Sequence, residues 1–190
     1  MSDYHFPYFG PLVACTTVSK EQLKDLKKIC NKRVSHHKNL AGHFKDEWLL
    51  NCQDYHKIIL PQLEGFKGCY KKFYNRELNS MKPTAAWVNH MKAGDFNPPH
   101  IHTQCRFSSV LFLKVPKKLK EEAHRFEGTS EGPGYLSFRY GEDTSHDNNN
   151  VWAKLPEEGD MFIFPNFVVH WVFPFKTKDI ERVSIAANYN

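Results

Sequence analysis

The stretch GDFNPPHIH, residues 94–102, combines a turn, two prolines and two histidines one residue apart. In an extended strand, side chains at positions i and i+2 share a face about 7 Å apart at the Cα level, because each residue rises ~3.3 Å. The two prolines fix φ just upstream and keep the chain extended. We therefore expect His100 and His102 to point the same way and bind one metal ion, while Ile101 anchors the strand in the core.

A third histidine comes from the segment GDMFIFPNFVVH, residues 159–170. It reads as a turn, an apolar strand, a Pro-led bend and a histidine that opens a new strand. In a jelly roll such a segment can return beside the first histidine strand, which would bring His170 to the same metal. The alternatives are a hydrogen-bonded core histidine at position 170 and a pair of surface histidines at 100 and 102.

From residue 84 onward, short runs of β-branched and aromatic residues are separated by clusters of Gly, Pro, Asn and Asp. Frequent short strands between turns favour a sandwich or barrel, and an aromatic content of 14% agrees with this. We predict a mainly β fold, a double-stranded β-helix or jelly roll with N-terminal helices. The expected strands are residues 12–18, 85–92, 106–115, 135–140, 161–164, 170–173 and 182–188.

Residues 19–79 show helical periodicity instead. Ser19, with Gln22 three residues on, is typical of a capping box that starts a helix. A second helix is expected over residues 54–73, with a break or kink at Pro61 or Gly65. We expect these helices to support one face of the 84–190 core. The 190 residues contain no linker, so one domain over 1–190 is predicted.

Amino-acid composition limits the possible binding partners and the cellular compartment of the protein. The net charge is +5, but the lysines are spread along the chain, and this gives no signal for nucleic acid. The five cysteines are odd in number and widely spaced, which indicates reduced thiols. No export signal and no apolar run of ~20 residues is visible, so we expect a cytoplasmic protein without a membrane span.

An arginine opens the last expected strand, twelve positions after His170. Alternation along that strand puts Arg182 and Ser184 on one face. A guanidinium that points inward needs an anion, and its planar fork matches a carboxylate. The alternative is an ordinary ion pair with Glu181 or Asp160.

With these motifs, residues 87–188 resemble the Fe(II)- and 2-oxoglutarate-dependent oxygenases, in particular short bacterial and phage members. The likeness rests on WVN at 87–89, HIH at 100–102 with SSVLFL at 108–113, the 159–170 segment, and RVS at 182–184. A less specific likeness covers NLAG at 39–42.

The resemblance implies a jelly roll with Fe(II) held by His100, His102 and His170 at its open end. The co-substrate 2-oxoglutarate would chelate the metal, with Arg182 gripping its distal carboxylate and Ser184 assisting. Asn89 would line the same pocket. With O2, the enzyme would hydroxylate a C–H bond of a peptidyl or small-molecule substrate and release succinate and CO2.

The sequence departs from the family at one ligand. The usual set is two histidines and one carboxylate, whereas the position two after His100 is His102. Asp95 is the nearest alternative carboxylate, five residues before His100 and across the prolines. Asp95 ranks behind His102 as the third ligand, and a site of two histidines completed by water comes next.

Two rival classes share the architecture. The same residues resemble the cupin pattern, in which Gly94, five residues and His-x-His precede a Gly-Asp, Pro and His segment. A cupin usually adds a Glu soon after the histidine pair, and residues 103–106 read TQCR. A non-catalytic jelly-roll binding module is the other alternative. No motif reveals the substrate or the oligomeric state.

Other features are assigned no chemistry. Trp87 shares a face with Asn89, where it lines the pocket or packs in the core. Residues 117–134 and 141–150 are polar and are expected to form loops at the mouth or rim. Five further histidines are expected at the surface, at positions 36, 37, 43, 56 and 90.

Overall fold

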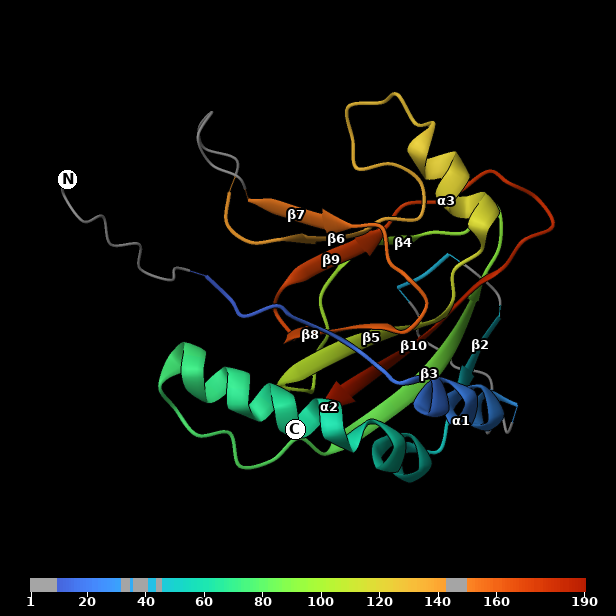
Figure 1. The fold of residues 1–190 in the computed structure, drawn as a ribbon. Helices are drawn as coiled ribbons and strands as arrows, with labels where there is room; N and C mark the ends of the chain where they lie inside the picture. The colour runs from blue at the N-terminus through green and yellow to red at the C-terminus, as the bar shows by residue number, and fades with distance from the viewer. Residues whose placement is uncertain (1–9, 32–34, 36–40, 44–45, 143–149) are drawn as a thin grey trace, which may run out of the picture.

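The computed structural model describes residues 10–31, 35, 41–43, 46–142 and 150–190. His36, His37 and the first half of the NLAG stretch lie outside these residues. Two antiparallel sheets face each other, and two helices cover the outer face of the larger one (Figure 1). The larger sheet has the order β1 (Ala14–Thr17), β8 (Asp160–Pro165), β5 (Phe107–Lys114), β10 (Arg182–Tyr189), β3 (Pro83–Met91), β2 (Asp46–Leu49). The smaller has the order β4 (Asn97–His100), β9 (Val169–Val172), β6 (Leu136–Arg139), β7 (Val151–Lys154).

The predicted jelly roll is confirmed, and each sheet face has its own packing. Between the sheets, Phe112, Phe162 and Phe164 are fully or almost fully buried. On the other face, Val88 and Ile185 pack with residues of α1 (Lys20–Cys30) and α2 (Cys52–Tyr74) in a second apolar cluster. Alternation along β3 and β10 therefore separates an aliphatic face toward the helices from a face toward the smaller sheet.

The first helix begins as its sequence indicates. The Ser19 hydroxyl accepts from the backbone N–H of Gln22 at 3.1 Å, and the Gln22 side chain accepts from the backbone N–H of Ser19 at 2.8 Å. Both bonds of the capping box are present, so two otherwise unpaired helix donors are satisfied. The capping-box prediction is confirmed.

The expected break in the second helix is wrong, because α2 continues through Pro61 without interruption. Proline removes one intrahelical hydrogen bond, at a cost of about 3 kcal/mol. The buried residues continue at helical spacing on both sides of Pro61, so packing on the sheet holds the helix together. These buried residues are Tyr55, Ile59, Leu63, Phe66 and Tyr70.

Several short elements differ from the sequence prediction. The expected loop at 117–134 begins with a helix, α3 (Lys117–His124), in which Leu119 and Ala123 are buried. The strand β2 lies inside the stretch expected to be helical, and β7 was not predicted as a strand, while the extended strand expected at the first two histidines ends earlier than expected, at His100. Conversely, β1 pairs with β8 at the sheet edge, as expected for residues 12–18. Across the described ranges, no helix has both the length and the apolar character needed to cross a bilayer.

Candidate metal centre and its polar cavity

Three histidines that are distant in sequence meet at one end of the sandwich. His100 closes β4 and pairs in register with His170 of β9. His102 lies just past the strand end, where two hydrogen bonds of 3.0 Å to Asn166 fix its backbone N–H and C=O. The smaller sheet and the 165–168 bend thus hold all three imidazoles.

The rings approach closely. The ring centroids of His100 and His170 are 4.2 Å apart, and those of His102 and His170 are 5.1 Å apart. The Nε2 atoms of His102 and His170 are 3.2 Å apart. One ring nitrogen from each histidine lies within 4.8 Å of the others, so the group can hold a metal ion.

Hydrogen bonds leave the correct nitrogens free for a metal. His100 Nδ1 is 2.7 Å from the carbonyl of Pro98, and His170 Nδ1 is 3.0 Å from the carbonyl of Val168. A ring nitrogen that donates to a carbonyl carries the proton, so Nε2 keeps its lone pair. The Nε2 atoms of His102 and His170 share a hydrogen bond when His102 carries its proton on Nε2, and a divalent metal can take the place of that proton.

Burial keeps these imidazoles uncharged at neutral pH. It lowers the pKa of His170 well below its ordinary value, and it lowers the pKa of His102 to about 4, with a further contribution from His100. The pKa of His100 is also lowered, mainly by burial. Neutral imidazole is the form that binds metals, so no proton has to leave at neutral pH.

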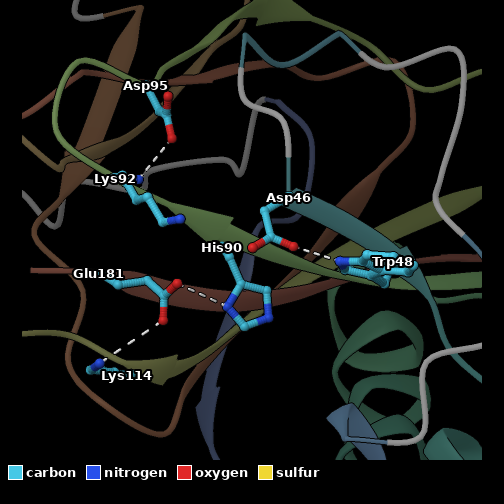
Figure 2. Close-up of polar contacts among 7 residues, drawn as sticks. All are labelled: Asp46, Trp48, His90, Lys92, Asp95, Lys114 and Glu181. Atoms are coloured by element: carbon cyan, nitrogen blue, oxygen red, sulfur yellow. Dashed lines mark hydrogen bonds and ion pairs between the residues drawn. The ribbon is translucent and has the colours of Figure 1, made fainter.

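Two neighbours of the histidine pair differ from expectation. Ile101 does not anchor the strand in the core, because strand pairing ends at His100 and the side chain is 50% exposed. Asp95 does not join the histidines: its carboxylate accepts from the backbone N–H of Lys92 at 2.8 Å and closes the preceding turn (Figure 2). The described residues place no carboxylate in the histidine group.

Arg182 points inward and lacks an anionic partner. Its side chain is 4% exposed, lies over the Phe112 ring at 5.2 Å and donates a single hydrogen bond of 3.3 Å to the carbonyl of Gly134. Its Nε is buried without a partner, and burial lowers the pKa of the guanidinium to about 10. The alternative ion pair does not form, because Glu181 pairs with His90 and Asp160 with Lys154.

Arg182, Ser184 and Asn89 line the same cavity as the three histidines. The cavity measures about 40 Å³, far below the roughly 300–1,000 Å³ of typical small-molecule pockets, so a larger ligand must push its walls apart. The Oδ1 atoms of Asn89 and Asn97 on its wall are buried without partners. Larger hollows of about 660 and 670 Å³ lie elsewhere and include none of these histidines.

Comparison with known proteins identifies the family. Residues 85–188 match the family described as "Putative 2OG-Fe(II) oxygenase", where 2OG is 2-oxoglutarate. The match covers more than half of the chain and includes all three histidines and Arg182. The chain belongs to this family.

A further comparison finds sequence similarity to germin-like proteins of rice. A rice protein, "Putative germin-like protein 2-1" of Oryza sativa subsp. japonica, is 28% identical over 113 residues, which cover 60% of this chain and 42% of that protein. This chain thus spans about two-fifths of that relative's length. The phage-type subgroup expected from the sequence finds no support in these matches.

Two solved structures share the fold at low identity. A Pseudomonas putida prolyl-4-hydroxylase matches with a TM-score of 0.59 and 13% identity, covering 94% of this chain and 91% of the other. A viral collagen prolyl hydroxylase of Paramecium Bursaria Chlorella virus-1, in complex with 2OG, matches with a TM-score of 0.54 and 11% identity, covering 93% and 94%. Such identities establish the oxygenase fold alone.

Glu47 is a buried polar residue that sequence reasoning missed. It lies in β2, is 2% exposed, and its Oε2 is buried without a hydrogen-bond partner. Burial raises the pKa of this carboxyl to about 8. A single acidic residue in a short strand carries no sequence signal, because its burial depends on pairing with the distant β3.

We expect Glu47→Gln to flatten the pH dependence of folding stability. A carboxyl whose pKa rises from 4.5 to about 8 on folding contributes its stability in full below 4.5 and loses it as the pH rises through about 8. The difference between wild type and variant should therefore change by about 1.4 kcal/mol per pH unit inside that window. Urea unfolding across the window measures it, and parallel curves would contradict a buried, protonated Glu47.

A second group of possible ligands lies on the opposite face of the larger sheet. His90 was expected to be a plain surface residue, but its Nδ1 is 3.2 Å from a Glu181 oxygen, and Asp46 lies close to both (Figure 2). Asp46 also accepts from the Trp48 indole at 2.5 Å, and Lys114 is 4.0 Å from Glu181. Glu181, which directly precedes β10, thus contacts His90 of β3 and Lys114 of β5, and Asp46 of β2 lies beside them.

Proposed function

We propose that this chain is an Fe(II)- and 2-oxoglutarate-dependent dioxygenase that hydroxylates a C–H bond of a peptidyl or small-molecule substrate, with release of succinate and CO2. One observation carries the proposal: a buried guanidinium without an anionic partner shares a small cavity with three neutral imidazoles. A metal alone accounts for the imidazoles but leaves Arg182 unexplained. A ligand with a carboxylate at the far end from the metal accounts for both.

His100, His102 and His170 would hold the iron through their Nε2 atoms. When bound, iron supplies the chemistry by which O2 and 2-oxoglutarate oxidise a C–H bond. The protein's part is to fix the imidazole orientation through the carbonyls of Pro98 and Val168 and to keep water out with the phenylalanines between the sheets. Three neutral ligands leave the 2+ charge to be balanced by the 2-oxoglutarate dianion alone.

Arg182 would bind the distal carboxylate of 2-oxoglutarate. A guanidinium fork binds a carboxylate through two parallel hydrogen bonds, and a buried site strengthens them. Ser184 adds a hydroxyl donor on the same strand face, and Asn89 lies across from it in register on β3. The viral prolyl hydroxylase of the same fold was solved with 2OG, and the names of both matched hydroxylases point to prolyl substrates, which favours a peptidyl target.

The test uses protein stripped of metal with a chelator, because purified material can carry a tighter-binding ion than Fe(II). Anaerobic addition of Fe(II) and 2-oxoglutarate should produce a weak visible charge-transfer band, and admission of O2 should yield succinate. Iron binding without a band or succinate would favour a cupin-type metal enzyme that does not use 2-oxoglutarate. Absence of metal binding would favour a non-catalytic module.

A further inference from the structure

We infer that the prime substrate carries a cationic nitrogen and that Glu47, buried beside Asn89 of the cavity wall, holds this group once the cavity opens to admit the substrate. The inference rests on the proposed function and names the substrate class for the same site. It concerns a residue outside the matched family region, which begins at residue 85.

The register of β2 places Glu47 on the cavity face of the larger sheet. Glu47 pairs with Asn89 and Leu49 pairs with Trp87, and both partners line the cavity. Side chains of directly paired residues share a face with Cβ atoms about 5 Å apart. Asp46 points to the other face, where it lies beside His90 (Figure 2). Glu47 is therefore the carboxyl of β2 that is directed between the sheets.

A second contact brings the start of β4 to the same side. His43, three residues before β2, donates its backbone N–H to the carbonyl of Phe96 at 2.8 Å, and the two rings stack with centroids 4.5 Å apart. The next residue, Asn97, lines the cavity. Asn89 of β3 and Asn97 of β4 thus bound one polar side of the cavity, and Glu47 of β2 is paired in register with Asn89 directly behind that wall.

The oxygens on this side lack donors. Oε2 of Glu47, Oδ1 of Asn89 and Oδ1 of Asn97 are all buried without a hydrogen-bond partner. A buried acceptor left unpaired costs about 1–3 kcal/mol, and a charged one costs more. A carboxyl and two amide oxygens together call for a group with several N–H donors, which an ammonium or a guanidinium provides.

Two buried ionisable groups, Arg182 and Glu47, are kept apart in this molecule. Arg182 pairs in register with Met91 and Glu47 with Asn89, on different strands, and no ion pair joins the two side chains. Each then bears its desolvation cost without the attraction that offsets it in a buried pair. This arrangement is expected if each group receives its own ligand, an anion at Arg182 and a cation at Glu47. Within the described chain, no basic side chain pairs with Glu47.

Burial also explains how Glu47 is tolerated without a ligand. Its pKa is raised to about 8, so the side chain remains protonated and uncharged near neutral pH. A cationic group that enters the cavity favours the carboxylate, and the resulting charged pair is shielded from water. The same carboxyl rejects anionic substrates by repulsion and neutral ones by leaving its acceptors unpaired.

Calorimetric titration of the zinc-loaded full chain with 2-oxoglutarate bound tests this inference. The probes are pairs of capped amino acids, acetylated at the α-nitrogen and amidated at the carboxyl: arginine against citrulline, and lysine against norleucine. Glycine amide against its acetylated form tests an α-ammonium. We expect at least one cationic probe to bind about tenfold or more tightly than its neutral partner, because a buried charge pair is worth at least that much.

Three variants identify the residue responsible. Glu47→Gln should abolish the preference for the charged probe while leaving the affinity for 2-oxoglutarate unchanged, which also shows that the variant is folded. Glu47→Asp keeps the charge and should retain part of the preference. Asp46→Asn removes a carboxylate from the neighbouring position on the opposite face and should leave the preference intact.

Two results would overturn the inference: equal binding of every charged probe and its neutral partner, or a preference that survives in Glu47→Gln. Failure of the proposed function has a different signature, because wild-type protein would then not bind 2-oxoglutarate at all. The probe titrations repeated with the zinc-loaded protein alone would still measure the preference for a cation.

Discussion

Arg182→Met is expected to abolish measurable 2-oxoglutarate binding while the affinity for metal stays at the wild-type value. Loss of one partner of a buried, hydrogen-bonded charge pair costs about 2–5 kcal/mol, equivalent to roughly a thirtyfold to several-thousandfold weaker complex. Titration of the zinc-loaded protein with 2-oxoglutarate measures the loss. The histidines lie on other strands, so metal binding should not change.

The same substitution should leave the ligand-free protein as stable as wild type or more so. Arg182 donates one hydrogen bond of 3.3 Å and has an unpaired Nε, so its burial is poorly compensated. An apolar side chain of similar length removes that desolvation cost. Urea unfolding without metal tests this, and marked destabilisation would indicate a structural arginine instead of a ligand-binding one.

Arg106→Met provides the matched control. Arg106 precedes β5, is exposed, donates to the Tyr70 hydroxyl at 2.9 Å and lies over the Phe107 ring. It does not line the cavity of the histidines. The control variant should bind 2-oxoglutarate normally, and unchanged binding in Arg182→Met as well would refute the assigned role of Arg182.

His170→Ala is expected to have the largest effect on the metal. Removal of a hydrogen-bond partner behind a metal ligand costs roughly 10- to 100-fold in affinity, and loss of one of three protein ligands should cost more. His170 is the central ligand, because its ring lies within 5.1 Å of both other rings. Anaerobic Fe(II) titration should show the loss, and the band with 2-oxoglutarate should disappear.

His90→Ala serves as the control for the second ligand group. His90 lies on the opposite face of β3 with Asp46 and Glu181, so its removal should leave iron affinity and the band unchanged. If His90→Ala lost iron and His170→Ala retained it, the metal centre would have been assigned to the wrong group.

The sequence predicts the jelly roll and its histidines because the signals are local. Alternation in 182–188, the turn clusters and the apolar run before His170 each act over a few residues, and the fold follows from their order. The inward direction of Arg182 was likewise predictable from its place at the start of a strand. The close approach of the three Nε2 atoms depends on the pairing of β4 with β9, which no local pattern specifies.

The elements that the sequence analysis failed to predict have a common physical origin. Strands β2 and β7 are four residues long each, and they are stabilised by pairing with other strands, β3 and β6. Helix α3 buries two apolar side chains in a lysine- and glutamate-rich segment, so its periodicity is weak. In α2, tertiary packing outweighs the local effect of Pro61. Glu47 belongs to this group, since only the register with β3 places its carboxyl beside the cavity residue Asn89.

The pairing of β2 with β3 has an evolutionary consequence. The metal ligands and the arginine lie inside the region shared with the family, while the glutamate proposed to select the substrate lies before it, on a strand that pairs with one neighbour in the described chain. Under the proposed roles, the metal and 2-oxoglutarate sites and the substrate-selecting residue would be encoded in separable parts of the gene. Exchange of the upstream part could redirect such an enzyme to a new target while its reactive centre is inherited intact.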